Sequence, residues 1–320
     1  MSTRETTWLS NDMDRVEKLL QDTAGASSHP LVSEACLHLI KAGGKRVRPA
    51  LVLLASHAGG AGAGTTDLSA AAVELVHLAT LYHDDVMDQS ETRRGVPTAH
   101  SKWGTEVAVL AGDYLFACGC ALGADAGGEV PGILARAIAR VCEGQIVETA
   151  SLNDPHRSVD DYLDTISLKT AALFRASCEL GAATSGASEV DRRALVTYGE
   201  KLGLAFQVVD DLLDLLGDPA STGKRPGTDL KAGVFTAPVL IACNRDPSLA
   251  GRLSSGRREL DDVLPTLIST GALGSATDLA HRFRTEALDE LTLLDPGAWR
   301  DSLEDLVESV LGQIPRVPAA

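Results

Sequence analysis

The sequence is poor in aromatic and in basic residues, and both shortages narrow the possible structures. Phe, Tyr and Trp number only 5, 4 and 3 among 320 residues. Because β-sandwiches and barrels are enriched in aromatic and β-branched side chains, this composition favours helices. Lys and Arg total 29 against 44 Asp and Glu, which gives a formal net charge of −15. A field of that sign repels a phosphate backbone, so we expect no nucleic-acid partner.

Three other features are not found in the sequence: a CxxC motif, an apolar signal-peptide core near residue 1, and a long apolar run. Its six cysteines form no CxxC pair, so neither a zinc ribbon nor a thioredoxin-like site is indicated. Met1–Asn11 has no apolar core of the signal-peptide type. The longest uncharged run, Pro49–Thr66, is interrupted by glycines and falls short of the ~20 apolar residues that span a bilayer. We therefore expect a cytoplasmic protein without an integral membrane segment.

Helical periodicity runs along the whole chain. Apolar residues recur at spacings of three and four residues in these stretches: Trp8–Leu20, Leu31–Ile40, Ala70–Met87, Val107–Leu122, Ile133–Ala150, Val159–Leu180, Arg192–Leu216 and Leu260–Leu311. No alternating stretch rich in Val, Ile and Thr competes with them. The Gly, Pro, Ser and Asp clusters between them are too short for interdomain linkers. We predict one all-α domain over residues 1–320.

Two acidic clusters stand at the ends of long apolar stretches. They read Asp84-Asp85-Val86-Met87-Asp88 and Asp210-Asp211-Leu212-Leu213-Asp214. Residues i and i+4 share a helix face, so the first and last Asp of each cluster point the same way. Like charges at this spacing destabilise a helix unless a cation compensates, and Mg²⁺ bound by carboxylates and phosphate oxygens would do so. A solvated helix end explains one such cluster, but two clusters favour magnesium.

Basic residues follow both acidic clusters closely. Arg93-Arg94-Gly95 follows the first and Gly223-Lys224-Arg225-Pro226-Gly227 the second, while Lys169-Thr170 lies in another predicted helix. A dense basic loop is expected at Gly43–Pro49, which reads GGKRVRP. Arg binds phosphate oxygens bidentately, and Lys supplies a point charge. The pattern indicates a polyphosphate between Mg²⁺ and basic side chains, although surface salt bridges would explain any single loop.

Other catalytic motifs are missing. The sequence contains no P-loop, HExxH, GxSxG or kinase signature. His83 precedes Asp84 and is a candidate metal ligand, but a lone His is more often packed or hydrogen-bonded.

Taken together, the motifs resemble those of the trans-polyprenyl diphosphate synthases. The matching segments, between about Gly43 and Pro238, are GGKRVRP, HDDVMD, RRG, GQIVE, LKT, FQVVDDLLD and GKRPGTDL. The resemblance implies an all-α helical bundle around a central cavity, usually as a homodimer. It implies head-to-tail condensation of isopentenyl diphosphate with an allylic diphosphate to an all-trans polyprenyl diphosphate. It also implies Mg²⁺ as the cofactor, with three ions per active site.

The resemblance assigns a role to each matching residue. Mg²⁺ would be bound by Asp84, Asp85, Asp88, Asp210, Asp211 and Asp214. The allylic diphosphate would be held by Arg93, Lys169 and Lys224, and isopentenyl diphosphate by Lys45, Arg48, His77 and Arg94. The catalytic residues would be Lys169, Thr170 and Gln207, the last two facing the allylic cation, with Gln145 on a neighbouring helix. The sequence departs from the family pattern at Val234, where many members carry a diphosphate-contacting Lys.

Small residues precede the first acidic cluster, and they bear on product length. Ala79 and Thr80 lie one helical turn before Asp84, and Val76 lies deeper on that face. Short-chain family members often carry a bulky aromatic residue there. We therefore expect a medium-to-long product of, by resemblance, roughly six to ten isoprene units, each about one helical turn or ~5 Å long. A geranylgeranyl- or farnesyl-length product is the alternative if the small residues only permit close packing, or if Tyr82 narrows the tunnel.

Two other functions stay open. A class I terpene cyclase would ionise the same type of substrate, but its second metal motif usually resembles NDxxSxxxE, and it would have little use for the isopentenyl diphosphate set. A regulatory subunit of a heteromeric synthase would typically have a degraded acidic motif, whereas both motifs are intact here.

Overall fold

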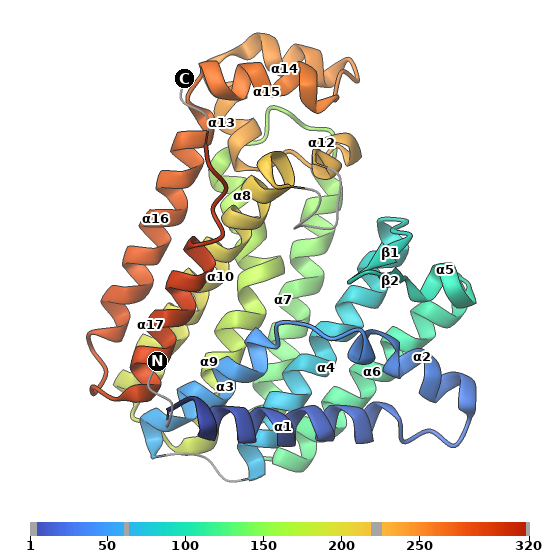
Figure 1. The fold of residues 1–320 in the computed structure, drawn as a ribbon, viewed down its shortest axis with the longest axis vertical. Coiled ribbons are helices and arrows are strands. Elements are labelled where there is room, and N and C mark those ends of the chain that lie inside the picture. The colour runs from blue at the N-terminus through green and yellow to red at the C-terminus, as the bar shows by residue number, and fades with distance from the viewer. Residues whose placement is uncertain (1–4, 61–63, 219–225, 318–320) are drawn as a thin grey trace. The chain divides into compact units, whose positions relative to one another are not determined.

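The chain is almost entirely helical. The computed structural model describes residues 5–60, 64–218 and 226–317 (Figure 1). Within these ranges only two strands occur, β1 (Thr92–Arg93) and β2 (Val96–Pro97), which pair antiparallel. The predicted all-α class is therefore confirmed. The chain divides into two compact units, and one domain around a central cavity stays a prediction.

The first unit comprises residues 1–138, 173–196 and 293–303. Its own helices are α1 (Glu5–Ala24), α2 (Pro30–Lys41), α3 (Val47–Ser56), the 3₁₀ turn η1 (His57–Gly59), α4 (Gly64–Met87), α5 (Ala99–Trp103) and α6 (Thr105–Ala126). Four further helices contribute residues to both units: α7 (Val130–Ala150), α9 (Ala172–Ser185), α10 (Glu189–Leu216) and α17 (Ala298–Leu311).

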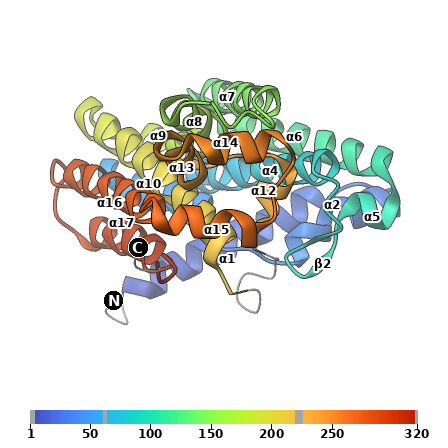
Figure 2. The ribbon, with the colours of Figure 1, turned by 90° about the horizontal axis from the view of Figure 1, so that it is seen from above.

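Helix α4 forms the core of the first unit. A helix that is apolar on nearly every side is stable only when it is buried, and α4 packs against α1, α3 and α6. Helices α4 and α6 lie side by side in both views (Figures 1 and 2). Gly119 on α6 makes this approach possible, because a Cβ there would lie 3.0 Å from the Ala72 carbonyl oxygen and 3.1 Å from Val76 Cγ2.

Helix α6 is strongly apolar although much of it is exposed. Of the described helices, it alone is long and apolar enough to cross a membrane by length and composition. Its best window has a mean hydropathy of 1.7 but is only 39% buried, although the core helix of a folded protein passes the same test. Leu110, for example, is 65% exposed. The sequence predicts this helix over Val107–Leu122, but Asp113 interrupts its uncharged run, so it is not the longest uncharged run of the chain.

The second unit comprises residues 139–172, 197–292 and 304–320. Its own helices are α8 (Val159–Ile166), the π-helical turn η2 (Ser167–Ala171), α12 (Thr228–Ala232), α13 (Ala237–Arg245), α14 (Pro247–Ser254), α15 (Leu260–Ser269) and α16 (Ala272–Leu291). Helix α13 is central here, and it packs against α8, α14, α15 and α16 (Figure 2). The long stretches expected over Val159–Leu180 and Leu260–Leu311 are therefore each divided into shorter elements.

Two local predictions need correction. The basic segment Gly43–Pro49 is not a loop throughout, since α3 begins at Val47 and includes Pro49. A proline is tolerated there because first-turn N–H groups have no partner within the helix. The β1–β2 hairpin was not expected, and it turns through Arg94 (φ 53°) and Gly95 (φ 76°). Two consecutive positive φ angles are typical of the tight turns that join antiparallel strands.

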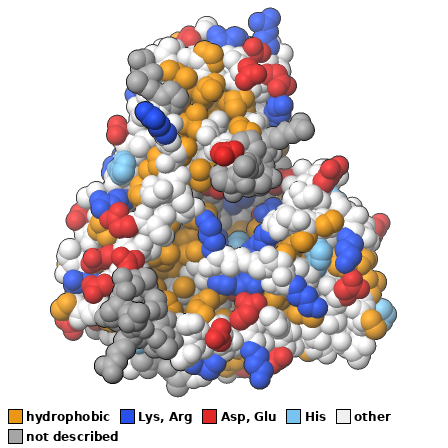
Figure 3. Space-filling view, viewed as in Figure 1, with side chains coloured by type: hydrophobic (Ala, Val, Ile, Leu, Met, Phe, Trp, Pro, Cys, Tyr) orange, Lys and Arg blue, Asp and Glu red, His pale blue; other side chains and the backbone are white. Residues whose placement is uncertain are grey.

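Charge is distributed rather than concentrated on the face in view. Figure 3 shows acidic side chains interspersed with basic ones over that face. The net charge of −15 therefore forms no single acidic patch there.

We expect Gly119→Val to destabilise the protein. The new side chain would push α6 away from α4, and overpacking of this kind costs about 1–3 kcal/mol. Gly274→Ala is the matched control, because nothing lies within 4 Å of a Cβ built at that position on α16. It should be neutral or stabilising by up to about 1 kcal/mol. Equal midpoints for both variants in chemical unfolding would contradict the close α4–α6 contact.

Candidate active site

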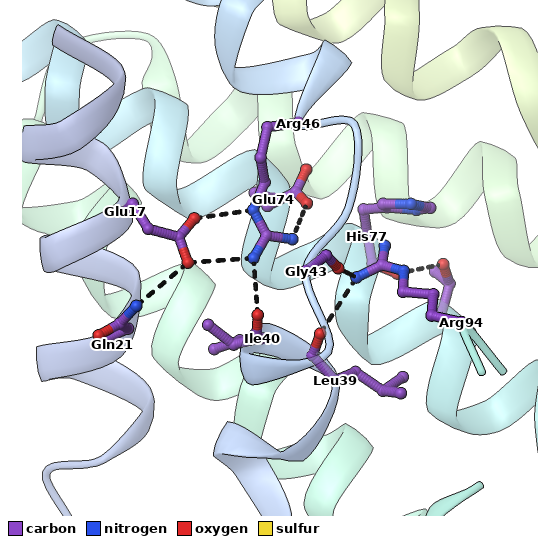
Figure 4. A network of polar contacts seen from close by, with 10 residues as sticks. Glu17, Gln21, Leu39, Ile40, Gly43, Arg46, Glu74, His77 and Arg94 are labelled. Atoms are coloured by element: carbon purple, nitrogen blue, oxygen red, sulfur yellow. Dashed lines mark hydrogen bonds and ion pairs between the residues drawn. The ribbon is translucent and has the colours of Figure 1, made fainter. Parts of the chain in front are cut away.

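The β1–β2 hairpin directs two adjacent arginines to different partners. Arg93 Nε donates to Asp85 Oδ1 at 2.6 Å, so it is tied to the first acidic cluster. Arg94 Nη1 donates to the carbonyl oxygens of Leu39, at 3.1 Å, and Gly43, so it is tied to the basic segment (Figure 4). One turn thus serves two separate charged groups.

The first acidic cluster occupies the C-terminal end of α4. Asp84 is half-buried and Asp88 is exposed, whereas Asp85 is 1% exposed. Burial raises the pKa of Asp85, and the Arg93 guanidinium opposes that rise. Asp85 Oδ2 is buried and has no hydrogen-bond partner within the described part of the chain. The cluster therefore holds a carboxylate oxygen that still has an acceptor site to offer.

A group of cations lies between the basic segment and α4. Burial lowers the pKa of Arg48 to about 10, and the nearby Arg94 charge acts in the same direction. Arg48 Nε is buried without a hydrogen-bond partner among the described residues, and its guanidinium lies 4.9 Å from the Phe174 ring centroid. Burial, with Arg48 and Arg94, holds the pKa of His77 well below its usual value. His77 is therefore neutral at neutral pH, and this group is built to receive an anion.

The structure brings three of the four residues predicted to hold isopentenyl diphosphate into one electrostatic group. These are Arg48, His77 and Arg94. Lys45 is exposed and lies next to Arg46 in the segment before α3.

In the second unit, Lys169 and Thr170 lie on the π-helical turn η2. Gly144 on α7 faces this turn, and a Cβ there would lie 2.4 Å from the Lys169 backbone nitrogen. Lys169 Nζ also donates to Glu148, one turn further along α7. The GQIVE segment thus provides close backbone approach and a counter-charge for Lys169, and π-turns of this kind are frequent at functional sites.

The second acidic cluster is joined to that turn by a chain of hydrogen bonds. Thr170 Oγ1 donates to Gln207 Oε1 at 2.7 Å, and Gln207 Nε2 donates to Asp211 Oδ1 at 2.9 Å. Tyr162 Oη donates to Asp211 Oδ2. Burial raises the pKa of Asp211 well above its usual value. Because both ends of the Gln207 amide are bonded, its oxygen is held toward Thr170.

The remaining aspartates of this cluster have different surroundings. Asp210 is exposed. Asp214 accepts from the backbone N–H groups of Thr228 and Asp229, both at 3.2 Å, and so caps the start of α12. Of the other predicted contacts, Lys224 lies outside the described residues, and Gln145 Oε1 is buried without a hydrogen-bond partner in the described ranges.

The residues predicted to set product length are packed on α4. Val76 and Ala79 are fully buried, and Thr80 Oγ1 donates to the His77 carbonyl oxygen at 2.7 Å. Tyr82 donates to the Ala35 carbonyl oxygen at 2.5 Å, which fixes its ring against α2. His83 Nε2 lies 3.1 Å from the Val109 carbonyl oxygen, in agreement with a packed structural role.

Sequence reasoning missed three residues of these groups. Tyr162 and Glu148 contact predicted site residues, and Arg46 lies between two of them. Glu148 belongs to the GQIVE segment, so the motif carried a signal. Tyr162 lies on α8, and none of the matching sequence segments includes it.

The donor set fits a hard divalent cation. Within the described residues no three His, Cys, Asp or Glu side chains already converge as a metal centre. Mg²⁺ does not need such a cage, because it binds one or two carboxylates and completes its shell with water and phosphate oxygens. The helix-face pair Asp84 and Asp88, with the unpartnered oxygen of Asp85, offers this kind of ligand.

Comparison with known proteins agrees with this chemistry. The family model "Polyprenyl synthetase" matches residues 29–263. A nonaprenyl diphosphate synthase of Mycobacterium tuberculosis is 37% identical, with 92% of this chain and 90% of that protein covered. Component 2 of the heptaprenyl diphosphate synthase of Bacillus subtilis is 34% identical, with coverage of 95% and 88%.

A solved structure adds a ligand. The polyprenyl synthase of Caulobacter crescentus, crystallised with calcium and isoprenyl diphosphate, superposes with a TM-score of 0.91 at 36% identity, covering 97% of each chain. The chain described here therefore belongs to the polyprenyl synthetase family, the trans-polyprenyl diphosphate synthases.

Proposed function

We propose that the chain elongates an allylic diphosphate with isopentenyl diphosphate to a medium-to-long all-trans polyprenyl diphosphate, using the residues that its motifs indicate. The observation that carries this proposal is that the two adjacent arginines of the β1–β2 hairpin bind different partners. Arg93 is bonded to the acidic cluster, and Arg94 is bonded to the basic segment. The reaction uses two diphosphates: the allylic diphosphate leaves as pyrophosphate, and the diphosphate of isopentenyl diphosphate is retained. Two separate charged groups could bind one each.

Basic side chains would bind the diphosphates of both substrates. Arg93, Lys169 and Lys224 would hold the allylic diphosphate, as the motifs indicate. Arg48, His77 and Arg94, with Lys45, hold isopentenyl diphosphate. An anion at this group offsets the repulsion among the arginines and supplies a partner for the buried Arg48 Nε. Neutral His77 donates a ring N–H to that anion.

Catalysis would combine ionisation and positioning. Mg²⁺, three ions in all, would be held by the aspartates of the two motifs: Asp84, Asp85, Asp88, Asp210, Asp211 and Asp214. Mg²⁺ held by these carboxylates would supply positive charge to neutralise the diphosphate leaving group. The Thr170 hydroxyl and the fixed Gln207 amide oxygen face the allylic cation and stabilise it. The isopentenyl double bond then attacks, and the proton that is lost goes to the released pyrophosphate.

The small side chains on α4 support a long product. Ala79 and Val76 carry no bulky ring, and Tyr82 is bonded to α2. The relatives named above make nonaprenyl and heptaprenyl diphosphates according to their names. Both observations favour an elongation path along α4, whereas the close Gly119 contact belongs to helix packing.

A second copy of the chain would cover α6. Val109 and Leu110 are 37% and 65% exposed on a helix that is otherwise apolar. Small or apolar side chains also line its exposed side further along, at Ala117, Cys120 and Ala121. This supports a homodimer rather than a membrane span, because Asp113 is exposed in the middle of the helix. The cytoplasm stays the predicted location.

The purified chain should form a polyprenyl diphosphate when given Mg²⁺, isopentenyl diphosphate and an allylic primer. Mass spectrometry of products from primers of several lengths measures this. Product formation from the allylic diphosphate alone would instead identify a cyclase. Activity that appears only after a second protein component is added would assign the chain to a heteromeric synthase, as the name of the Bacillus relative indicates for that protein.

Replacement of Ala79 by Phe should shorten the product. A ring at this fully buried position adds bulk one turn before Asp84 and blocks elongation along α4. Because overpacking costs about 1–3 kcal/mol, chemical unfolding accompanies the assay. Gly274→Ala is the control: nothing lies within 4 Å of a Cβ built at this position on α16, so the product distribution should not change. If a folded Ala79→Phe variant gives an unchanged product distribution, Ala79 does not line the elongation path.

Tyr162→Phe should slow the reaction and destabilise the fold. It removes a hydrogen bond to the buried Asp211, and a typical hydrogen bond of this kind contributes about 0.5–1.5 kcal/mol. Asp211 loses one of the two bonds that orient it toward Gln207, so kcat should fall about tenfold or more. Steady-state rates and calorimetry measure both effects. If kcat matches the wild type while stability falls, the chain of hydrogen bonds has only a structural role.

A further inference from the structure

Arg46 is a buried cation to which the family motifs assign no role. It is 8% exposed, and its guanidinium binds two carboxylates and a backbone carbonyl (Figure 4). Nε donates to Glu17 Oε2 at 2.8 Å, and Nη1 donates to Glu74 Oε1 at 3.0 Å. Nη2 donates to Glu17 Oε1 at 3.2 Å and to the Ile40 carbonyl oxygen at 3.1 Å. One side chain therefore connects α1, the end of α2 and α4.

The backbone at Arg46 shows why so many contacts are needed. Arg46 has φ 47° and ψ 37°, in the left-handed region, immediately before α3. A non-glycine residue there costs on the order of 1 kcal/mol and persists only when its surroundings hold it. The guanidinium contacts supply that hold, so the side chain fixes an unfavourable backbone turn.

This turn lies between two residues predicted to bind substrate. Lys45 precedes Arg46 and is exposed, while Arg48 lies two residues later in the first turn of α3. A relaxed turn at Arg46 would change the direction of both side chains. Arg94 holds the other end of the same segment through the Leu39 and Gly43 carbonyl oxygens. The segment is therefore fixed at both ends by arginines.

Glu74 connects the Arg46 contacts to the group formed by Arg48, His77 and Arg94. It is 2% exposed on α4, one turn before His77. It pairs with Arg46, and its charge also favours the charged form of Arg48. The buried Glu74 carboxylate thus stabilises both Arg46 and the charged form of Arg48.

We propose that Arg46 is a positioning residue for isopentenyl diphosphate: its clamp on Glu17, Glu74 and the Ile40 carbonyl fixes the left-handed turn that orients Lys45 and Arg48. This inference rests on the proposed function, since it names the diphosphate that these two cations hold. It assigns no contact between Arg46 and substrate, because all three guanidinium nitrogens are already bonded within the protein.

The test compares Arg46→Gln and Arg46→Lys with the wild-type chain. Arg46→Gln removes the charge and the fork, whereas Lys keeps the charge but cannot bind two carboxylates bidentately. Misplacement of the cations should raise KM for isopentenyl diphosphate about tenfold to a hundredfold in Arg46→Gln, with a smaller rise in Arg46→Lys. KM for the allylic primer, whose predicted ligands lie elsewhere, should stay within about twofold of wild type.

Arg15→Lys is the matched control. Arg15 lies on α1 and, like Arg46, pairs with an acidic residue of α4, here Asp67, but it is 55% exposed and far in sequence from the basic segment. This variant should leave both KM values unchanged. Should it raise KM for isopentenyl diphosphate as Arg46→Gln does, the docking of α1 on α4 is the cause, and the positioning role is refuted.

A second route is available if the Arg46 variants do not fold. Glu17→Gln weakens the half-exposed side of the clamp and keeps Glu74. Calorimetric titration with isopentenyl diphosphate should then show affinity reduced about threefold or more, a smaller loss than in Arg46→Gln. Unchanged affinity in folded Glu17→Gln, or equal rises in both KM values for Arg46→Gln, overturns the inference. A wild-type chain that makes no product from isopentenyl diphosphate would overturn the proposed function instead.

Discussion

Repulsion among closely spaced cations is the constraint on which the first unit depends. Four arginines and a histidine share one region: Arg46, Arg48, Arg93, Arg94 and His77. Burial and this repulsion together leave His77 neutral and lower the pKa of Arg48. Carboxylates on α1 and α4 offset part of the charge, and the remainder is suited to bind an added anion. The repulsion that this region must tolerate and the diphosphate binding proposed for it thus have one physical cause.

The helices were predictable because their signal is local. A three- and four-residue apolar period appears wherever one face of a helix is buried, so α4, α6, α7 and α10 were all expected close to their observed bounds. The chemistry of the site was predictable for a similar reason. Charged motifs such as HDDVMD are contiguous in sequence, and a helix brings residues i and i+4 to one face.

The unpredicted features depend on backbone geometry or on residues distant in sequence. The turn at Arg94 and Gly95 needs two consecutive positive φ angles, and only the glycine signals this. The π-turn at Lys169 interrupts an apolar period without a proline or glycine of its own; its explanation is Gly144, 25 positions away on α7. The bonding of Arg46 to Glu17 and Glu74 joins residues 29 and 28 positions apart, which no local pattern encodes.

Each charged motif also divides its residues between two tasks, and helix geometry enforces the division. Asp84 and Asp88 share one face of α4, while the intervening Asp85 turns into the protein and pairs with Arg93. In the second unit Asp210 is exposed, while Asp211 is buried against Tyr162 and Gln207.

The basic segment follows the same rule. Lys45 is exposed, and its neighbour Arg46 is bonded within the protein. Like charges repel one another when they point in the same direction. A neighbouring side chain that points the other way and pairs with a carboxylate can therefore anchor the segment. Motifs of this kind are dense in charge because they combine exposed charged residues with charged residues that are bonded within the protein.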